Sequence, residues 1–458
     1  MSVLARQPFS LVEPPPPARP SPFRPPPCRR FQLPNGLRVV LVEHPATPLL
    51  HLHCAVLAGA QYDPPEHEGF ASLLMPLLRE GTAGRSAERI SEETEDTGAD
   101  LITWADWDAG SLVLELLAED VGFGVELIFD LLLSPVFPPA AVESLRHKQL
   151  AKFRQRQWKA AEIANDRFAH AVYDGTVYGR PLNGSESGLS DIDRDDLVDF
   201  HRTFFGFRNM TLIGVGNFQA TTLMRHLESA LPSTPQGRRA QPPVIAPPAL
   251  PGKRVYLVNS PHASQTELRV GHASVARNHP EFARLQVLSR ILDRRLNANL
   301  RERRGYCYHV RSRFAARGGP GPFITAAGVA NDSVGAAVRE IECEVERLQQ
   351  EPIPEEEISG ARNHLSGDFL RSFQSSHGVV AGLRQAAVND LPDNHFESYL
   401  EEIHAVGPKP LTALARQYLH ADGHVVVAVG PAREIHKQIA GAGQVTEVDS
   451  RSGDSGVT

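Results

Sequence analysis

The side chains that could bind a metal are the first features to test for chemistry. Zinc peptidases place two histidines one helical turn apart, with a glutamate that acts on the bound water. His67 and Glu68 form the only pair that could begin an H-E-x-x-H motif, but residue 71 is alanine. The inverted motif, H-x-x-E-H, does not occur. The sequence therefore contains neither zinc motif.

Two other histidines, His51 and His53, share one face of an expected strand because strand side chains alternate. A zinc site there would need a third ligand, which the nearby sequence does not supply. Core or surface histidines are the simpler interpretation. The four cysteines have neither metal-ligand spacing nor a disulfide pattern, and we expect them to be reduced: Cys28, Cys54, Cys307 and Cys343.

The glycine-rich run RGGPGP, residues 317–322, is a weak candidate for a phosphate loop. Its prolines remove backbone donors, and no Gly-Lys-Ser/Thr follows. We interpret it as a turn between strands. No G-x-S-x-G elbow occurs. A Ser-His-Asp triad assembled only by the tertiary structure stays open.

The stretch from Glu281 to His309 is a candidate for function. Leucines at three- and four-residue spacing predict an amphipathic helix, and Gly305 predicts its end. A strand is expected to follow, so Arg301 and Tyr308 flank the turn. Two readings remain: Arg301 caps the helix while Tyr308 packs in the sheet, or both side chains have a function.

The chain that must position these residues has 458 residues and is long enough for several domains. Proline and glycine content predicts the boundaries. We expect a disordered proline-rich tail (1–29), a first domain (30–230), a proline-dense linker too polar to pack well (231–252), a second domain (253–440) and a mobile tail (441–458).

The two predicted domains have the same order of elements: two strands, a helix, two strands, several helices and a closing strand. In the first domain one long helix is expected from Pro138 to about Ala171. The repeated order indicates an internal duplication. We therefore predict an α+β fold with two homologous α/β-sandwich halves, each a mixed sheet with helices on one face.

Composition excludes some classes of protein. The net charge is −7, which argues against nucleic-acid binding as the main activity. No apolar run approaches the roughly 20 residues of a membrane span. The start of the sequence lacks the apolar core of a secretory signal, so we expect a cytoplasmic protein. A mis-assigned start codon would leave a periplasmic or secreted location open.

Several segments together resemble the pitrilysin/insulinase family of zinc metallopeptidases. The resemblance covers about Arg30 to Ala432, and in combination the motifs are specific. They read PNGLRVVLVEHPATP, AGAQYDPPEHEGFASLLMPLLREGT, SAERISEETEDTGADLITWADWD, VYGRPLNGSESGLSDIDRDDLVDFHRTFFGFRNMTLIGVGNF and LRERRGYCYHVRS. The resemblance implies that the two halves form one half of a clamshell.

The family carries H-x-x-E-H in the segment that here reads GFASLLMPLLREGT. The flanking residues put Ser72, Met75 and Pro76 at the three motif positions, and the downstream glutamate ligand falls near Lys152. None of these side chains is a suitable zinc ligand or base. The resemblance therefore implies a non-catalytic member whose zinc motif is degenerate, with no cofactor in this chain.

The family also uses an Arg and a Tyr seven positions apart, which reach across from the opposite half of the clamshell. Arg301 and Tyr308 match this spacing. By resemblance they contact the substrate backbone and the oxyanion at the scissile carbonyl, where one such donor is commonly worth about 3 kcal/mol. The family often has a glycine pair earlier in this helix, where Asp293 and Arg294 stand here.

The leading hypothesis is a zinc-less subunit of a heterodimeric metallopeptidase. A zinc-bearing paralogous subunit would be its partner, and an extended peptide held against a sheet edge would be the substrate. The alternative is a non-enzymatic structural or peptide-binding member of the same fold. Catalysis by an unrecognised site is a third possibility, for which no residue argues.

Overall fold

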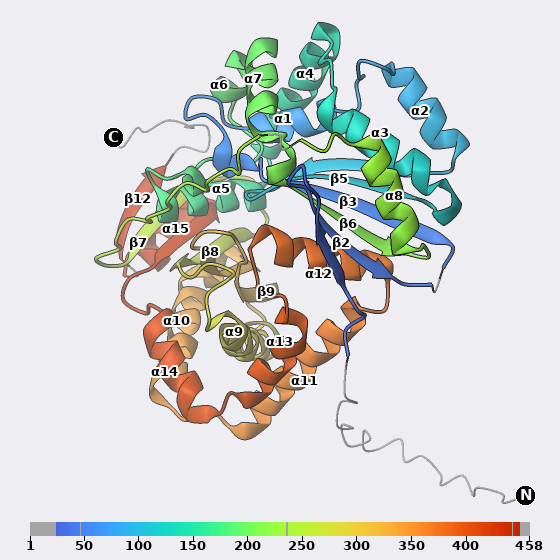
Figure 1. Cartoon of the computed structure of the whole chain (residues 1–458). Coiled ribbons are helices and arrows are strands. Elements are labelled where there is room, and N and C mark those ends of the chain that lie inside the picture. The colour runs from blue at the N-terminus through green and yellow to red at the C-terminus, as the bar shows by residue number, and fades with distance from the viewer. Residues whose placement is uncertain (1–23, 46, 235–236, 442, 449–458) are drawn as a thin grey trace, which may run out of the picture.

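The computed structural model describes residues 24–45, 47–234, 237–441 and 443–448, and two six-stranded sheets dominate it (Figure 1). The first sheet contains β1 (Arg29–Gln32), β2 (Arg38–Glu43), β3 (Leu49–Val56), β4 (Asp100–Ala105), β5 (Gly110–Leu117) and β6 (Met210–Gly216). The second contains β7 (Arg254–Asn259), β8 (Thr266–Ala273), β9 (Cys307–Phe314), β10 (Pro322–Val329), β11 (Val425–Gly430) and β12 (Gln444–Val448).

The two sheets have the same topology. Their strand orders are β1-β2-β6-β3-β5-β4 and β12-β7-β11-β8-β10-β9, so β2–β6 correspond one by one to β7–β11. Strand β2 pairs in parallel with β6, and β7 pairs in parallel with β11. The other pairs within β2–β6 and within β7–β11 are antiparallel. The predicted α+β fold with two homologous halves is confirmed.

Apart from α5 and α12, the helices of each half cover one face of that half's own sheet. The first half has α1 (Phe70–Leu77), α2 (Ala87–Asp96), α3 (Val121–Leu133), α4 (Pro139–Arg156), α5 (Ala160–Tyr173), α6 (Glu186–Asp191), α7 (Arg194–Phe204) and α8 (Ala220–Ala230). The second has α9 (Phe282–Leu296), α10 (Val334–Gln350), α11 (Glu355–Ser372), α12 (Ser376–Val388), α13 (His395–Ala405), α14 (Pro408–Tyr418) and α15 (Ala432–Ile439). Alternate strand residues point into these helix layers and form one large core in each half.

The opposite face of each sheet is covered in part by a helix from the other half. Helix α12 packs on β3 and β6, where Val380 and Leu383 meet Ile213 in an apolar cluster. Helix α5 packs on β8 and β11, where Phe168 and Val427 share another. The exchange of helices is reciprocal, so the two halves bury apolar surface that neither could bury alone.

The RGGPGP run forms the predicted turn, between β9 and β10, and also joins the halves. The guanidinium of Arg317 lies 4.7 Å from the ring centroid of Trp107 and 4.5 Å from that of Tyr178. The next backbone N–H, of Gly318, donates to the Asp108 carboxyl at 3.0 Å. A cation held between aromatic faces is stabilised electrostatically.

The expected long helix from Pro138 to Ala171 is wrong, because it is broken into α4 and α5 around Trp158. After the break α5 leaves the first helix layer to dock on the second sheet. Arg156 spans the break, with ion pairs to Glu162 and Asp166 at 3.2 Å each. Tertiary packing overrides a continuous helical pattern here.

Two expectations about connecting segments are corrected. The tail expected to be mobile from residue 441 contains β12, which pairs in parallel with β7 and so satisfies an otherwise open sheet edge. The linker forms no helix or strand in its described residues, but it does pack, since Ile245 is buried between the halves. Residues 1–23 of the expected disordered tail lie outside the described residues, and β1 begins at Arg29.

Candidate functional site

Helix α1 carries the positions where the family has its zinc motif, and Asp63 fixes its start. The backbone N–H groups of Gly69, Phe70 and Ala71 donate to the Asp63 carboxyl at 2.9, 3.1 and 2.9 Å. These groups have no partner inside the helix, and the helix dipole favours a negative charge beside them. Asp63 therefore holds the first turn of α1 in place.

The three motif positions on α1 face different environments. The Ser72 hydroxyl donates to the carbonyl oxygen of Gly69 at 2.9 Å. Met75 is fully buried in the core, and its sulfur would collide with any side chain added at Gly110. Pro76 stands inside the helix and is half-buried. None of the three offers an imidazole or a carboxylate at the position of a ligand.

The structure brings Gln149, rather than Lys152, to the motif. Helix α4 packs on α1, and the Gln149 side-chain amide donates to the Ser72 hydroxyl and, at 3.4 Å, to the carbonyl oxygen of Asn183. Lys152 lies three residues later on the same helix and is exposed. The position of the family's downstream glutamate ligand was placed near Lys152 by counting residues along the chain. Counting does not show which turn of α4 faces α1.

The donor chemistry at this position does not fit a zinc ion. A hydroxyl, a thioether, a proline and an amide replace the nitrogen and carboxylate donors that zinc prefers. In the part of the chain that the structure describes, no group of three or more His, Cys, Asp or Glu side chains could hold a metal.

The strand histidines lie on the sheet face that α12 covers. His51 is 3.0 Å from the Glu115 carboxylate. His53 is buried and meets the Trp104 ring edge-on at 5.5 Å. Burial, reinforced by the charges of Arg384 and His377, lowers the pKa of His53 to about 3. Both are packed strand residues, as the simpler interpretation of the sequence had it.

Arg301 lies in a segment where the helix widens. After α9 the chain continues as a π-helix, Asn297–Arg303, whose end is fixed by the Tyr306 N–H bonding to the carbonyl oxygen of Leu300 at 2.8 Å. Such widened turns shift the residues after them around the helix and are frequent at functional sites. Leu300 stays in the core while Arg301 is exposed.

Tyr308 lies at a second irregularity, on the edge strand β9. Where β10 has only Gly328, β9 has two residues, Tyr308 and His309, which is a β-bulge. Tyr308 is 87% exposed, so it does not pack in the sheet. Burial raises the pKa of the adjacent Cys307 thiol, and the charge of Arg301 partly opposes this.

The outer edge of β9 is closed. Side chains of α9 and of the residue after it bind its backbone: Gln286 to Phe314 O (3.4 Å), Ser289 to Ser312 O (2.9 Å), Asp293 to Ser312 N (3.0 Å) and Asn297 to Val310 O (3.0 Å). A strand cannot add to an edge whose groups are already bonded. Asp293, which stands where the family often has glycine, is one of these blocking residues.

The equivalent edge of the first sheet, β4, is open. Among the described residues no side chain bonds to the backbone of Asp100–Ala105, and α1 packs beside this strand. Two large apolar side chains of β4 reach solvent, with Ile102 46% and Trp104 38% exposed. Exposed apolar groups beside an unpaired edge are typical of peptide-binding strands.

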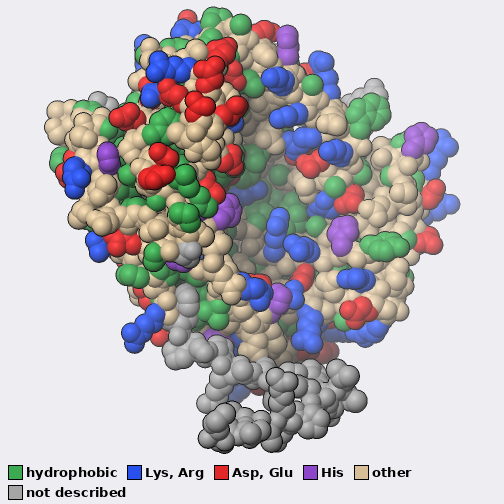
Figure 2. Space-filling model, turned by 90° about the vertical axis from the view of Figure 1, so that its right-hand side faces the viewer, with side chains coloured by type: hydrophobic (Ala, Val, Ile, Leu, Met, Phe, Trp, Pro, Cys, Tyr) green, Lys and Arg blue, Asp and Glu red, His purple; other side chains and the backbone are tan. Residues whose placement is uncertain are grey.

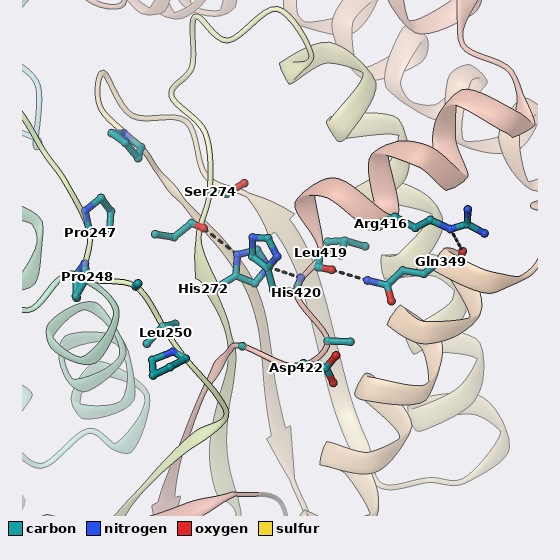
Figure 3. A pocket seen from close by; sticks show the side chains of 16 residues that line it. Pro247, Pro248, Leu250, His272, Ser274, Gln349, Arg416, Leu419, His420 and Asp422 are labelled. Atoms are coloured by element: carbon teal, nitrogen blue, oxygen red, sulfur yellow. Dashed lines mark hydrogen bonds between the residues drawn. The ribbon is translucent and has the colours of Figure 1, made fainter.

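A separate cavity of about 710 Å³ lies in the second half, between residues 247–251 of the linker and the connection from α14 to β11 (Figure 3). His272 on its wall accepts the backbone N–H of His420 at Nε2 (3.2 Å) and donates from Nδ1 to the Ala273 carbonyl (2.9 Å). Burial lowers the pKa of His272 to about 3. With both ring nitrogens occupied, His272 is not free to act as a base.

Figure 2 shows one face of the molecule, which has a hollow with hydrophobic side chains at its floor. Lys and Arg side chains lie along one wall of the hollow, and acidic side chains gather on the opposite upper surface. The negative net charge is therefore unevenly distributed. In the described residues no helix is both long and apolar enough to cross a membrane.

Sequence comparison identifies the family. The sequence model described as Insulinase (Peptidase family M16) matches residues 38–186, and the one described as Peptidase M16 inactive domain matches residues 191–365. The two matches follow one another; the second begins within the first half, before α7, β6 and α8, and ends within α11 of the second half. The chain belongs to peptidase family M16, the insulinase family.

Bacterial relatives extend the match to M16 proteins of similar length. An uncharacterized zinc protease of Mycobacterium bovis is 26% identical over 399 residues, which cover 85% of this chain and 90% of the relative. An uncharacterized zinc protease of Rickettsia felis is 22% identical, and the match covers 74% of this chain and 82% of that relative.

Solved structures agree with the fold of this M16 chain. A peptidase M16 inactive domain from Pseudomonas fluorescens superposes with a TM-score of 0.81 at 22% identity, covering 88% of this chain and 98% of that one. A protease from Helicobacter pylori superposes with a TM-score of 0.83 at 18% identity, and the match covers 88% of this chain and 99% of that one. A chain of complex III2 from Candida albicans superposes with a TM-score of 0.76 at 12% identity, and the match covers 90% of this chain and 98% of that one.

Sequence reasoning missed three features of the site: the role of Gln149, the anchoring of α1 by Asp63, and the difference between the two sheet edges. Asp63 lies six residues before Gly69, too far for an ordinary helix cap to be recognised. The polar residues at 286, 289 and 293 of α9 and at 297 just after it recur at helical spacing, which was the available signal for the closed edge.

Proposed function

We propose that this M16 chain is a subunit without catalytic zinc in a two-subunit zinc peptidase. The observation that carries the proposal is the contrast between its two candidate sites. Helix α1 offers no donor set for zinc, whereas Arg301 and Tyr308 are both exposed, each at a local irregularity of the backbone. A π-helical turn and a β-bulge are costly to keep unless the side chains they present are used.

In this proposal the partner is a paralogous subunit that carries H-x-x-E-H and the zinc. Arg301 and Tyr308 of this chain reach the partner's site, where a guanidinium and a phenol donate hydrogen bonds to the substrate backbone and to the oxyanion. An extended peptide lies along the open edge of β4, against Ile102 and Trp104. The closed edge of β9 leaves β4 as the better strand for this role.

The test is co-expression with a zinc-bearing M16 paralogue, followed by peptide cleavage with the purified complex. Replacing Arg301→Ala or Tyr308→Phe is expected to lower kcat/KM by about 100-fold, since one oxyanion donor is worth about 3 kcal/mol. Arg225→Ala, an exposed arginine on α8, is the matched control and should leave the rate unchanged. Unchanged rates in both site variants would reject the role in trans.

A structural or peptide-binding role is the second candidate. One observation favours it: the fold is shared with a chain of complex III2 from Candida albicans, so an M16 fold can serve in a large assembly. Purification of this chain in a stable homodimer, or with a partner that carries no zinc motif, would support this alternative.

A further inference from the structure

The two sheets present equivalent faces of opposite character. Each face is partly covered by a helix from the other half, and the edge strand lies beyond that helix. On β4 the exposed residues at alternate positions are Asp100, Ile102 and Trp104, and the last two are apolar. On β9 the exposed residues at alternate positions are His309, Arg311 and Arg313. We call this second row the basic face.

The basic face is not neutralised by the protein itself. Most arginines just before it have an acidic partner: Arg284 with Glu281, Arg290 with Asp293, Arg295 with Glu357 and Arg304 with Glu340. By contrast, within the described part of the chain, Arg311 and Arg313 form no salt bridge.

The spacing of the two arginines suits an extended peptide. Same-face residues of a strand recur every second position, about 6.8 Å apart, and the same holds for alternate residues of an extended ligand. Carboxylates at positions i and i+2 of a peptide can therefore meet Arg311 and Arg313 at once. The half-buried Ile324 and Ala326 of β10 lie opposite these arginines and give the ligand a small apolar surface.

The closed edge of β9 defines how such a ligand would bind. Because side chains of α9 occupy the outer backbone groups, recognition must come from side chains of the face rather than from strand pairing. A nucleic acid fits less well, because a chain with net charge −7 repels a polyanion over long range. A short acidic segment meets the basic face with a smaller penalty.

We propose that the basic face selects peptides with acidic residues at alternating positions, which sets the substrate class of the proposed peptidase. This inference rests on the proposed function: one segment of the extended substrate pairs with the β4 edge, and a second, acidic segment of the same substrate meets the basic face, which follows Tyr308 along β9. It assigns Arg311 and Arg313 a role in specificity and none in bond cleavage.

The test measures binding of labelled 12-residue peptides to the purified chain alone, by fluorescence anisotropy at 20 and 300 mM salt (roughly spanning strong and weak screening). One peptide carries glutamates at alternating positions, and its partner carries glutamines. The acidic peptide is expected to bind about tenfold more tightly than the glutamine peptide at low salt, because it forms two exposed ion pairs whose contributions to affinity multiply. The preference should shrink at high salt.

Removing both charges, Arg311→Ser/Arg313→Ser, should abolish the preference while binding of the glutamine peptide is unchanged. Arg225→Ser/Lys437→Ser removes the same charge from two exposed residues on α8 and α15 and should keep the preference. This control separates the basic face from the overall charge of the chain. Both double variants change only exposed residues, and circular dichroism checks that they fold.

Three results would overturn the inference: equal affinity for both peptides, a preference that survives in Arg311→Ser/Arg313→Ser, or tighter binding of a 12-nucleotide single-stranded DNA that displaces the acidic peptide. Equal but measurable affinity rejects the acidic class and leaves the proposed peptidase subunit standing. Conversely, charge-selective binding with no loss of cleavage in Arg301→Ala and Tyr308→Phe complexes rejects the subunit proposal alone.

Discussion

At the residue scale, Met75 is part of the hydrophobic core. The resemblance implies that Met75 stands where the family has the glutamate that works on the zinc-bound water, and Met75 is fully buried against β5. A carboxylate at position 75 would therefore be buried among apolar side chains.

Met75→Glu is accordingly expected to lower the free energy of unfolding by about 3 kcal/mol or more, because it buries an unpaired carboxyl. Urea denaturation followed by circular dichroism measures the change. Met75→Leu, which keeps volume and polarity, should cost less than about 1.5 kcal/mol. Similar stability of the two variants would contradict the packing described for Met75.

His53 is a residue whose burial makes stability depend on pH. Its folded pKa of about 3 lies below the unfolded value near 6.5, so the unfolded chain binds the proton first and stability is lost as pH falls below about 6.5. From these two pKa values, His53 lowers the free energy of unfolding by about 2 kcal/mol at pH 5 relative to pH 8.

His53→Phe should therefore flatten the decrease in stability between pH 8 and pH 5 by about 2 kcal/mol. Denaturation midpoints across this range give the measurement. The control is His262→Phe at an exposed loop position, which should keep the wild-type slope. A slope unchanged in His53→Phe would show that this histidine is not held neutral.

At the scale of elements, the difference between the two sheets lies in the helix beside each edge strand. Helix α9 is long enough to run along β9 and bond its backbone, whereas α1 ends after eight residues and leaves β4 open. The two homologous halves thus differ at these edges: among the described residues, side chains bond the backbone of β9 but not that of β4.

Asp293→Gly tests this protection. The variant loses the bond to the Ser312 N–H and the pair with Arg290, so we expect about 1–3 kcal/mol of destabilisation beyond the roughly 1 kcal/mol cost of glycine in a helix. Exposure of the β9 edge should also cause concentration-dependent association in sedimentation velocity. Arg294→Gly, its exposed neighbour, carries the same glycine cost and should stay monodisperse.

At the scale of the whole molecule, the reciprocal packing of α5 and α12 makes the halves one unit. Each helix is anchored by polar contacts as well as apolar ones: Arg384 of α12 bonds Asp106 at 2.6 Å, and Arg269 of β8 bonds Asn165 of α5 at 2.8 Å. Such an interface should hold without a covalent connection.

Cleavage of the linker is expected to leave the halves together. With a protease site inserted after Thr234, the two fragments should co-elute in size-exclusion chromatography. Leu383→Asp, which places a charge in the cluster between α12 and the first sheet, should separate the cleaved fragments or cause the intact chain to unfold. Separation of the fragments without that substitution would mean that the linker alone joins the halves.

The sequence by itself determined the fold class, the duplication and most elements, because hydrophobic periodicity and turn residues act locally. It also specified which side chains stand at the family's motif positions. Only the tertiary structure decided that α4 and α5 are separate helices, that Gln149 faces Ser72, and that β12 completes a sheet. These depend on contacts between residues far apart in sequence, which local patterns do not encode.

The same division applies to Arg301 and Tyr308. Their spacing is visible in the sequence, but the exposure of Tyr308 is not, since a tyrosine on a strand can pack in the sheet or face solvent. The π-helical turn and the β-bulge each add one residue to a regular element and turn the side chain outward. Whether a side chain near such a junction packs or faces solvent is decided by the packing of α9 and β9 together.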